Sequence, residues 1–287
     1  MQPAIHIKKT IDFNKGFRSL LEVMKLVAVS QYHILEKKLK HFEKLEDLMP
    51  EFFQSIDLNK IDHPFIHPGS RPMGVLAVTS DAGLLGGINM QVVSKAVELV
   101  NENKGRLIVV GDRGNIYAAT MGMPCISFPG VQDDRRLAQA YEMRDFLIQK
   151  ILSGEIGALK VVYPRAISFV VHRVDVANIL PFAKARKDAA PDVPPEPVYV
   201  EKDLILESTP KDVVEYLVYL ILGQRLYEIF GMSRLCEQAA RFTHLEESCQ
   251  KIQEMNQKLY LQYFRRRHEI IDANMRELFS ARSLYAK

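Results

Sequence analysis

Residues 17–49 read FRSLLEVMKLVAVSQYHILEKKLKHFEKLEDLM, and this stretch decides the fold. One set of apolar residues in it recurs once per heptad: Leu21, Ala28, Leu35, Phe42 and Met49. The companion register is interrupted twice by polar residues and runs Phe17, Met24, Gln31, Lys38 and Leu45. This spacing is typical of a helix that packs along another helix. With no Gly or Pro before Pro50, the stretch predicts a helix roughly 50 Å long with one apolar seam.

The same period returns near the other end of the chain, from Thr209 to about Ser283. Its apolar residues keep steps of three and four along Phe242, Leu245, Cys249, Ile252, Leu259 and Tyr263. Gly223 and Gly231 are weak helix formers, so we expect a bend at one of them. An unbroken helix here would be on the order of 100 Å long, whereas a compact domain of this size is only about 40 Å across. The helix must therefore project, and its apolar stripe needs a partner.

The middle of the chain alternates between two patterns. Short β-rich runs stand at 75–80, 106–110 and on both sides of Pro164, and helical patterns at 88–103 and 133–152 follow the first two runs. Such alternation predicts a sheet covered by helices, with at least the first strands parallel.

Breaker-rich stretches at 63–72 and 191–197 suggest linkers or exposed loops near both ends of this middle region. We therefore predict an N-terminal helix (1–62), an inserted α/β domain (63–208) and a C-terminal helix (209–287). The fold class is a mixed α and β protein in which the terminal helices form a long antiparallel coiled coil. Polar breaks in the two seams, which we expect to fix the register, are Gln31, Lys38, Asn256 and Arg266.

Composition argues against several classes of protein. A formal net charge of +3 is too small to indicate nucleic-acid binding by itself. The three cysteines form no CxxC pair, which favours a reducing compartment. The first residues contain no apolar signal core, and the longest apolar stretch, 213–223, is too short to span a bilayer. Any membrane association is therefore expected to go through a partner.

A glycine-rich turn, SDAGLLGGINMQ at 80–91, resembles the start of a phosphate-binding site. A P-loop requires a Lys and a hydroxyl residue that reach the phosphates, and neither follows Gly83, Gly86 or Gly87 at the required spacing. We interpret these glycines as a tight structural turn between a strand and a helix, with a ligand site as the open alternative. GDRGN at 111–115 is read in the same way, as a plain turn rather than an active-site loop.

Other candidate sites are weaker still. His63 and His67 have no neighbouring Cys or carboxylate to complete a metal site, and no Ser/His/Asp or Cys/His arrangement can be read from the sequence. Asp133 and Asp134 precede a helical pattern, where carboxylates favour the positive helix end, so we expect them to cap it. We therefore predict no catalytic residue, no cofactor and no metal.

One dense basic run, Arg265, Arg266, Arg267 and His268, lies late in the C-terminal helix. It is either a solvated helix face or a surface that attracts the acidic groups of a partner. Long-range attraction of this kind needs no fixed geometry. The sequence leaves both interpretations open.

Several segments, in order along nearly the whole chain, resemble the gamma subunits of F-type ATP synthases. They are IKKTI near the N-terminus, VMKLVAVS (23–30), TSDAGLLGGIN (79–89), VVGDRGNIY (109–117), VVYPRAIS (161–168) and EQAARFTHLEES (237–248). The chain departs from the family pattern at Ala82, where the family has Arg, and at Leu85, where it has Cys. A further departure is RHEIID at 267–272.

This resemblance implies a non-catalytic rotor that couples ion-driven rotation to ATP synthesis or hydrolysis. The implied partners are the α and β subunits of the catalytic ring, a stalk subunit of the ε type and the c-ring of the membrane sector, but no nucleic acid. The implied place is the cytoplasmic face of a bacterial inner membrane, as a peripheral protein. Contacts of the rotor with the ring are expected at Met24, Lys25, Arg241, Arg265, Arg266 and Arg267. Two alternatives stay open: the rotor of a diverged rotary ATPase used for ion pumping or motility, and a small-ligand-binding α/β protein.

Overall fold

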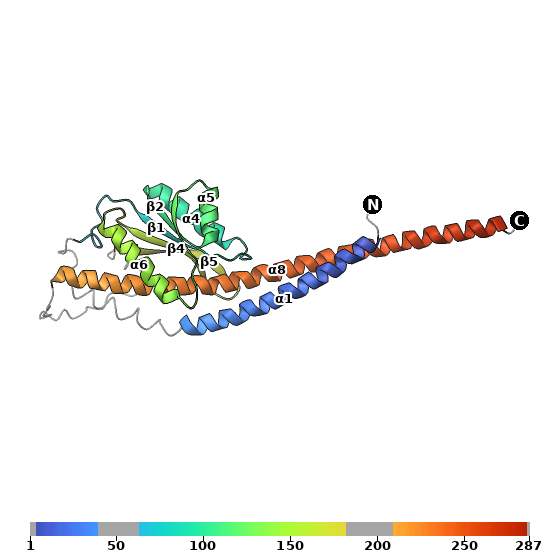
Figure 1. Ribbon diagram of the computed structural model, residues 1–287, viewed down its shortest axis with the longest axis horizontal. Helices are drawn as coiled ribbons and strands as arrows, with labels where there is room; N and C mark the ends of the chain where they lie inside the picture. The colour runs from blue at the N-terminus through green and yellow to red at the C-terminus, as the bar shows by residue number, and fades with distance from the viewer. Residues whose placement is uncertain (1–3, 40–62, 182–208, 286–287) are drawn as a thin grey trace, which may run out of the picture. The chain divides into compact units, whose positions relative to one another are not determined.

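The computed structural model describes residues 4–39, 63–181 and 209–285. Its elements follow in the order α1 (Ala4–Leu39), β1 (Gly74–Val78), α4 (Ile88–Asn103), β2 (Arg106–Val110), α5 (Asp112–Thr120), β3 (Cys125–Phe128), α6 (Arg136–Leu152), β4 (Leu159–Ala166), β5 (His172–Leu180) and α8 (Pro210–Tyr285) (Figure 1). The predicted seam residues Phe42, Leu45 and Met49 and the predicted linker at 191–197 lie outside the described residues.

Contacts divide the chain into two compact units. The first, which we call the helical unit, consists of residues 1–28 and 242–287. The second, which we call the sheet unit, consists of residues 29–241. Helices α1 and α8 each contribute to both.

The sheet unit is built on five strands in the order β3-β2-β1-β4-β5. Strand β1 pairs in parallel with β2 and β4, and β2 pairs in parallel with β3. Only β5 runs antiparallel, against β4. The prediction of a parallel start to the sheet is confirmed. Pro164 interrupts no ladder to β1, because β1 pairs with β4 only as far as Val162, two residues earlier.

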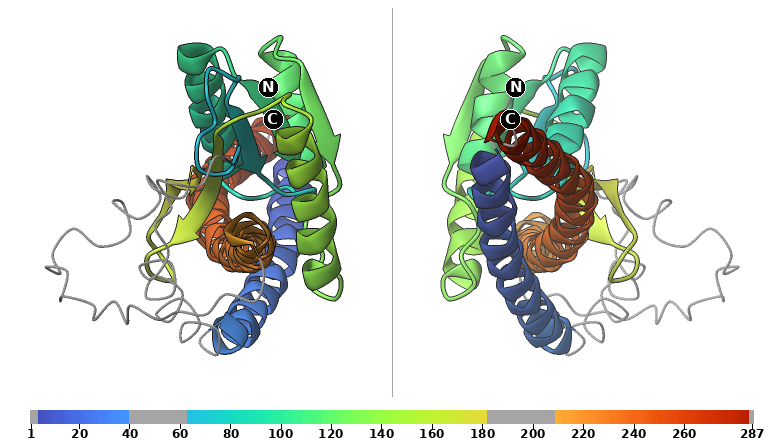
Figure 2. Two further views of the ribbon diagram at one scale, coloured as in Figure 1. Left: turned by 90° about the vertical axis from the view of Figure 1, so that its left-hand side faces the viewer. Right: turned by 90° about the vertical axis from the view of Figure 1, so that its right-hand side faces the viewer.

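Helices cover both faces of this sheet (Figures 1 and 2). Leu76 and Val78 of β1 face a core shared with α6 and α8, whereas Val75 and Ala77 face a core shared with α4 and α5. All five residues of β1 are buried, as expected of a strand in a parallel sheet that is covered on both sides. The continuous apolar run in the sequence follows from this two-sided burial.

Two elements of the sheet unit were not predicted. GDRGN is the start of helix α5 rather than a plain turn, with Gly111 at its N-cap position at φ 102°. A side chain at Gly114 would collide with Thr79, which is why α5 can lie close to the end of β1. Strand β3 has four residues with half-exposed and exposed side chains, so it carries no buried apolar run for a sequence pattern to detect.

Helix α8 passes through Gly223 and Gly231 as one helix of 76 residues, so neither glycine ends it. The two glycines instead allow close packing. A Cβ at Gly223 would lie 3.2 Å from atoms of Tyr141 and Arg144 on α6, and one at Gly231 would lie 2.6 Å from Leu39 of α1. The Arg144 guanidinium stacks over the ring of Tyr219 on α8, so the contact with α6 combines apolar packing with a cation–π interaction.

In the helical unit, α1 and α8 run antiparallel. Asn14 contacts Asn256, and Lys25, farther along α1, contacts Glu246, which is earlier on α8. Supercoiling of the pair stays a prediction. A small core in this unit consists of Leu21, Leu245, Cys249 and Ile252, with Met24 packed beside it.

One predicted register of α1 is confirmed, whereas in its companion only Met24 packs against the seam. Leu21, Ala28 and Leu35 are buried, whereas Phe17, Gln31 and Lys38 are exposed. The residues that α1 turns inward alternate in steps of four and three: Ile7, Ile11, Asn14, Leu21, Ala28, Tyr32 and Leu35 are buried, and Arg18 and Lys25 between them are half-buried. Thus the polar positions in the α1 seam are Asn14, Arg18 and Lys25, not Gln31 and Lys38.

No helix in the part of the chain that the structure describes combines the length and the hydropathy needed to cross a bilayer.

Candidate functional site

A buried pair of amides lies in the middle of the helical unit. The Asn14 Nδ2 donates a hydrogen bond to the Asn256 Oδ1 at 2.9 Å, and the two residues are 6% and 8% exposed. Because an amide buried without a partner is costly, this pairing favours one alignment of the two helices over others shifted by a turn. Asn256 was predicted to fix the register, and its partner proves to be Asn14.

An ion pair joins the two helices farther along the same seam. Lys25 Nζ lies 2.5 Å from a Glu246 carboxylate oxygen and over the ring of Phe242, 5.9 Å from its centroid. The hydrogen bond raises the pKa of the Lys25 ammonium and lowers the pKa of the Glu246 carboxyl, so both stay charged near neutral pH. Of the two neighbours predicted to contact a ring, Lys25 is thus engaged within the chain, and Met24 is half-buried against the seam.

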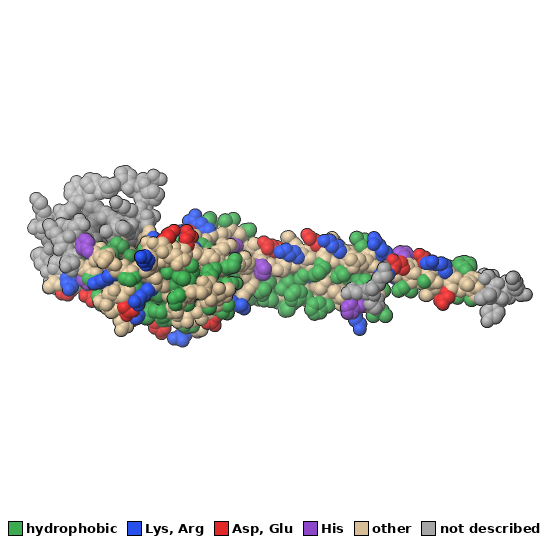
Figure 3. All heavy atoms as spheres, turned by 90° about the horizontal axis from the view of Figure 1, so that it is seen from above, with side chains coloured by type: hydrophobic (Ala, Val, Ile, Leu, Met, Phe, Trp, Pro, Cys, Tyr) green, Lys and Arg blue, Asp and Glu red, His purple; other side chains and the backbone are tan. Residues whose placement is uncertain are grey.

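The last part of α8 extends past the described start of α1. Since Asn14 faces Asn256, Ala4 falls opposite the region of Arg266, and every side chain from 267 to 281 is exposed. Exposed apolar residues of α8 from Leu261 onward, most of them on one stripe that continues into this part, are Leu261, Phe264, Ile270, Ile271, Met275, Leu278 and Phe279. Figure 3 shows apolar side chains at the surface of the paired helices beside charged ones. A stripe of this kind is typical of a helix that binds a partner.

The predicted basic run lies on this extension. Arg265 and Arg267 are exposed, whereas Arg266 is half-buried and pairs with Glu269 on the next turn. The three guanidiniums therefore point in different directions around α8. Arg241, the remaining predicted contact residue, lies in the sheet unit, where it is held by neighbours on α8.

The glycine turn between β1 and α4 is shaped by its backbone. Gly86 and Gly87 have φ values of 59° and 90°, which glycine adopts without strain, and Gly87 is the N-cap of α4. Gly83 has no such φ, and the left-handed position beside it is Leu84 at φ 65°. In the same turn, the Asn89 amide donates to the Ser80 Oγ at 2.9 Å and fixes the loop on the first turn of α4.

A carboxylate joins the loops that follow the first three strands of the parallel sheet. Asp81, after β1, accepts a hydrogen bond from the backbone N–H of Asp112 at 2.8 Å, at the start of α5 after β2. It also accepts from the backbone N–H of Gly130, after β3, at 2.9 and 3.1 Å. Helix N-termini at this edge of a sheet are where phosphates bind in many proteins. Here the chain's own negative charge occupies the N-terminus of α5, which agrees with a structural turn.

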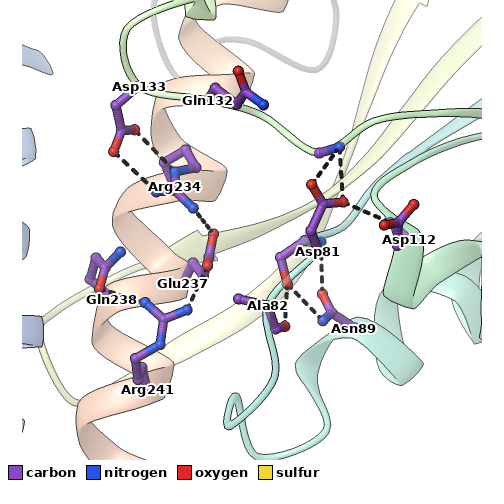
Figure 4. Close-up of polar contacts among 12 residues, drawn as sticks. Asp81, Ala82, Asn89, Asp112, Gln132, Asp133, Arg234, Glu237, Gln238 and Arg241 are labelled. Atoms are coloured by element: carbon purple, nitrogen blue, oxygen red, sulfur yellow. Dashed lines mark hydrogen bonds and ion pairs between the residues drawn. The ribbon is translucent and has the colours of Figure 1, made fainter. Parts of the chain in front are cut away.

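A chain of charges on α8 begins in the loop after β3 (Figure 4). The Asp133 carboxylate accepts two hydrogen bonds from Arg234, from its Nε and Nη2, both at 3.0 Å. Arg234 Nη1 donates to Glu237, and Arg241 donates to Glu237 at 2.7 Å and to Gln238 at 2.8 Å. Opposite charges therefore alternate from the loop along α8.

Burial and pairing act together on these groups. Desolvation alone would raise the pKa of the Asp133 carboxyl, but the Arg234 hydrogen bonds and charge outweigh it and lower that pKa. Burial would likewise lower the pKa of Arg234, yet Asp133 and Glu237 raise it above its ordinary value. The side chain of Glu237 is only 5% exposed, and each of its carboxylate oxygens accepts a hydrogen bond from one of the two arginines.

The chain is similar to known proteins over nearly its whole length. A family model described as ATP synthase matches residues 4–283. The chain belongs to this family. Two similar curated relatives are named ATP synthase gamma chain: that of Symbiobacterium thermophilum is 24% identical, covering 95% of this chain and 94% of the relative, and that of Clostridium pasteurianum is 26% identical, covering 96% of each.

Solved structures agree on the fold. A chain from the OSCP/F1/c-ring part of the Euglena gracilis mitochondrial ATP synthase matches with a TM-score of 0.72 and 15% identity, covering 98% of this chain and 93% of that one. A chain from the rotor of the same enzyme matches with a TM-score of 0.67 and 16% identity, covering 93% and 98%. The resemblance to gamma subunits of F-type ATP synthases is confirmed by the family model and by the curated relatives.

Within this family framework, the sequence missed the role of one residue. Asp133 was expected to cap α6, but α6 begins at Arg136 with Arg135 as its N-cap and no side-chain cap. Asp133 binds Arg234 on α8 instead, 101 positions away in the sequence. No local signal reports such a contact. The one available hint was that EQAARF contains an acidic and a basic residue four apart, Glu237 and Arg241, with Arg234 three residues before them.

Proposed function

We propose that the chain is the central-stalk rotor of an F-type ATP synthase and has no catalytic site of its own. Its paired helices would turn within a ring of α and β subunits and bias each nucleotide site in sequence between states of different affinity. The sheet unit would dock on a stalk subunit of the ε type and on the c-ring. The rotor would thus reach the cytoplasmic face of a bacterial membrane only through partners.

The observation that carries this proposal is the end of α8. Its exposed stripe includes Leu261, Phe264 and Leu278, which are 70%, 48% and 66% exposed. Large apolar side chains that stay exposed along a helix favour a partner that covers them. The relatives named ATP synthase gamma chain support a catalytic ring as that partner.

Reconstitution tests the proposal. The chain is co-expressed with the α, β and ε subunits of an F-type ATP synthase from the same organism, and the complex is purified through a tag on β. We expect a single copy of the chain per ring, and we expect the purified chain alone to hydrolyse no ATP. A ring that assembles and couples normally without the chain would refute the proposal, as would ATP turnover by the isolated chain.

The contribution of the stripe is tested in the same complex. Leu261→Asp and Leu278→Asp place a charge on the stripe without touching the seam of α1 and α8. Both variants should fold as the wild type does and join the ring poorly. Gln262→Asp, at an exposed polar position beside the stripe, is the matched control and should assemble normally.

A further inference from the structure

The hydrogen bonds of Arg234 decide how Glu237 is shared. Asp133 takes the Nε and Nη2 of Arg234, which leaves Nη1 for Glu237. With Nε and Nη2 on Asp133, Arg234 reaches Glu237 through Nη1 alone, at Oε2. The other oxygen of Glu237, Oε1, accepts the hydrogen bond of Arg241 at 2.7 Å.

Asp133 itself is held in a braced loop. Three residues before it, the Gly130 N–H donates to Asp81, and the Gly130 carbonyl accepts from Gln139 Nε2 of α6 at 3.0 Å. Gln139 also accepts from the backbone N–H of Gln132 at 2.8 Å. The loop is thus fixed to the edge of the sheet and to α6, so the position of Asp133 depends on the positions of both.

We propose that Asp133 is a positioning residue for Arg241: it holds two nitrogens of Arg234 and so leaves one oxygen of Glu237, Oε1, to align the Arg241 guanidinium. We call these four residues, Asp133, Arg234, Glu237 and Arg241, the relay. It links the edge of the sheet to a side chain on α8. Its relevance to coupling rests on the proposed function, in which Arg241 contacts the ring, but the relay itself does not.

The charges also give the direction of the effect. In Asp133→Asn, Arg234 keeps its charge and loses its bidentate partner, so its fork turns toward Glu237 and competes with Arg241 for that carboxylate. Glu237 is too buried to find a solvent partner for its charge. Arg241 therefore loses one of its two acceptors and gains freedom of movement.

The relay is tested in the full chain by the nitrogen-15 NMR signals of arginine side chains. The Nε–Hε signal of Arg241 is assigned by its loss in Arg241→Lys. Asp133→Asn should shift or broaden this signal. Asp175→Asn is the matched control, because Asp175 pairs with Arg165 and Arg173 in the β4–β5 hairpin rather than with Arg234. An Arg241 signal unchanged in Asp133→Asn would overturn the relay, and so would an equal change in Asp175→Asn.

A second variant covers the case in which Asp133→Asn folds poorly. Arg234→Lys keeps the positive charge near Glu237 but cannot form the two parallel bonds to Asp133. It should perturb the Arg241 signal in the same way. A wild-type signal in this variant would also overturn the relay.

Coupling is then measured in the reconstituted complex as ions pumped per ATP hydrolysed. Asp133→Asn should lower this ratio about twofold or more, while ATP hydrolysis continues. A twofold change lies at the lower end of the change in coupling that mutations between two linked sites produce. Asp175→Asn should leave the ratio unchanged. If the Arg241 signal changes but both Asp133→Asn and Arg241→Gln pump as the wild type does, Arg241 is no ring contact, and the link of the relay to coupling is refuted.

Discussion

The buried amide pair in the helical unit permits a quantitative prediction. Asn256→Leu removes the acceptor of the Asn14 amide, which is 6% exposed and then has no partner in the seam. An unsatisfied buried amide costs about 1–3 kcal/mol, and the added apolar surface of Leu offsets part of this. We expect a net loss of about 1–2 kcal/mol from the free energy of opening of the helical unit.

The matching double variant, Asn14→Leu with Asn256→Leu, should behave differently. It leaves no buried amide without a partner and adds apolar contact, so its stability should lie within about 1 kcal/mol of the wild type or above it. The two substitutions are therefore strongly non-additive. The cost of the double variant is specificity, because an apolar seam tolerates alternative registers.

Hydrogen exchange with mass spectrometry measures both effects. Peptides from the first half of α1 should exchange about five to thirty times faster in Asn256→Leu, while peptides from β1 and β2 are unchanged. The control is Gln253→Leu, at an exposed position one turn earlier on α8. Unchanged exchange in Asn256→Leu, or a double variant that loses the sum of both single effects, would refute the reasoning.

Three further predictions concern other groups. Burial raises the pKa of Glu228 above its ordinary 4.5, so the protonated form that the fold favours is lost as pH rises. The stability of Glu228→Gln relative to the wild type should therefore be greater at pH 8 than at pH 5, as measured by thermal unfolding. An equal difference at both pH values would contradict this. Burial raises the pKa of Cys236 to about 12, so iodoacetamide at pH 8 should label this thiol only after unfolding, as measured by mass spectrometry. Rapid labelling of Cys236 in the folded chain would contradict its burial. Changing Arg265, Arg266 and Arg267 together to Gln should leave folding and assembly unchanged and alter the rate of ATP hydrolysis more at low salt than at high salt. Identical rates for variant and wild type at low salt would mean that these arginines form only a solvated helix face.

The heptad pattern predicted the helix pair because burial in a seam repeats at the helical period. Leu21, Ala28 and Leu35 are buried as expected. The companion register failed because α1 is apolar on a second side: Phe17 is 44% exposed, while Lys25 lies half-buried against Glu246. A long basic side chain covers apolar surface with its stem, which a hydrophobicity pattern does not register.

The candidate site shows a similar division. The turn at Gly86 and Gly87 could be predicted because the residue type itself reports the backbone conformation. The bond of Asp133 to Arg234 could not, because it joins residues 101 positions apart and depends on where α8 crosses the sheet unit. Asp133 also stands where a helix cap is expected, so the local pattern favoured a different role.

The central claim, that this chain is the turning element of the complex, is tested most directly by observing rotation. The ring is fixed to a surface through β, and a bead is attached to a cysteine introduced at exposed Lys104 of the sheet unit, with the native cysteines left in place. On addition of ATP, we predict that the bead turns in one direction and stops when ATP is removed. Steady ATP hydrolysis by the same complexes with a stationary bead would contradict the account.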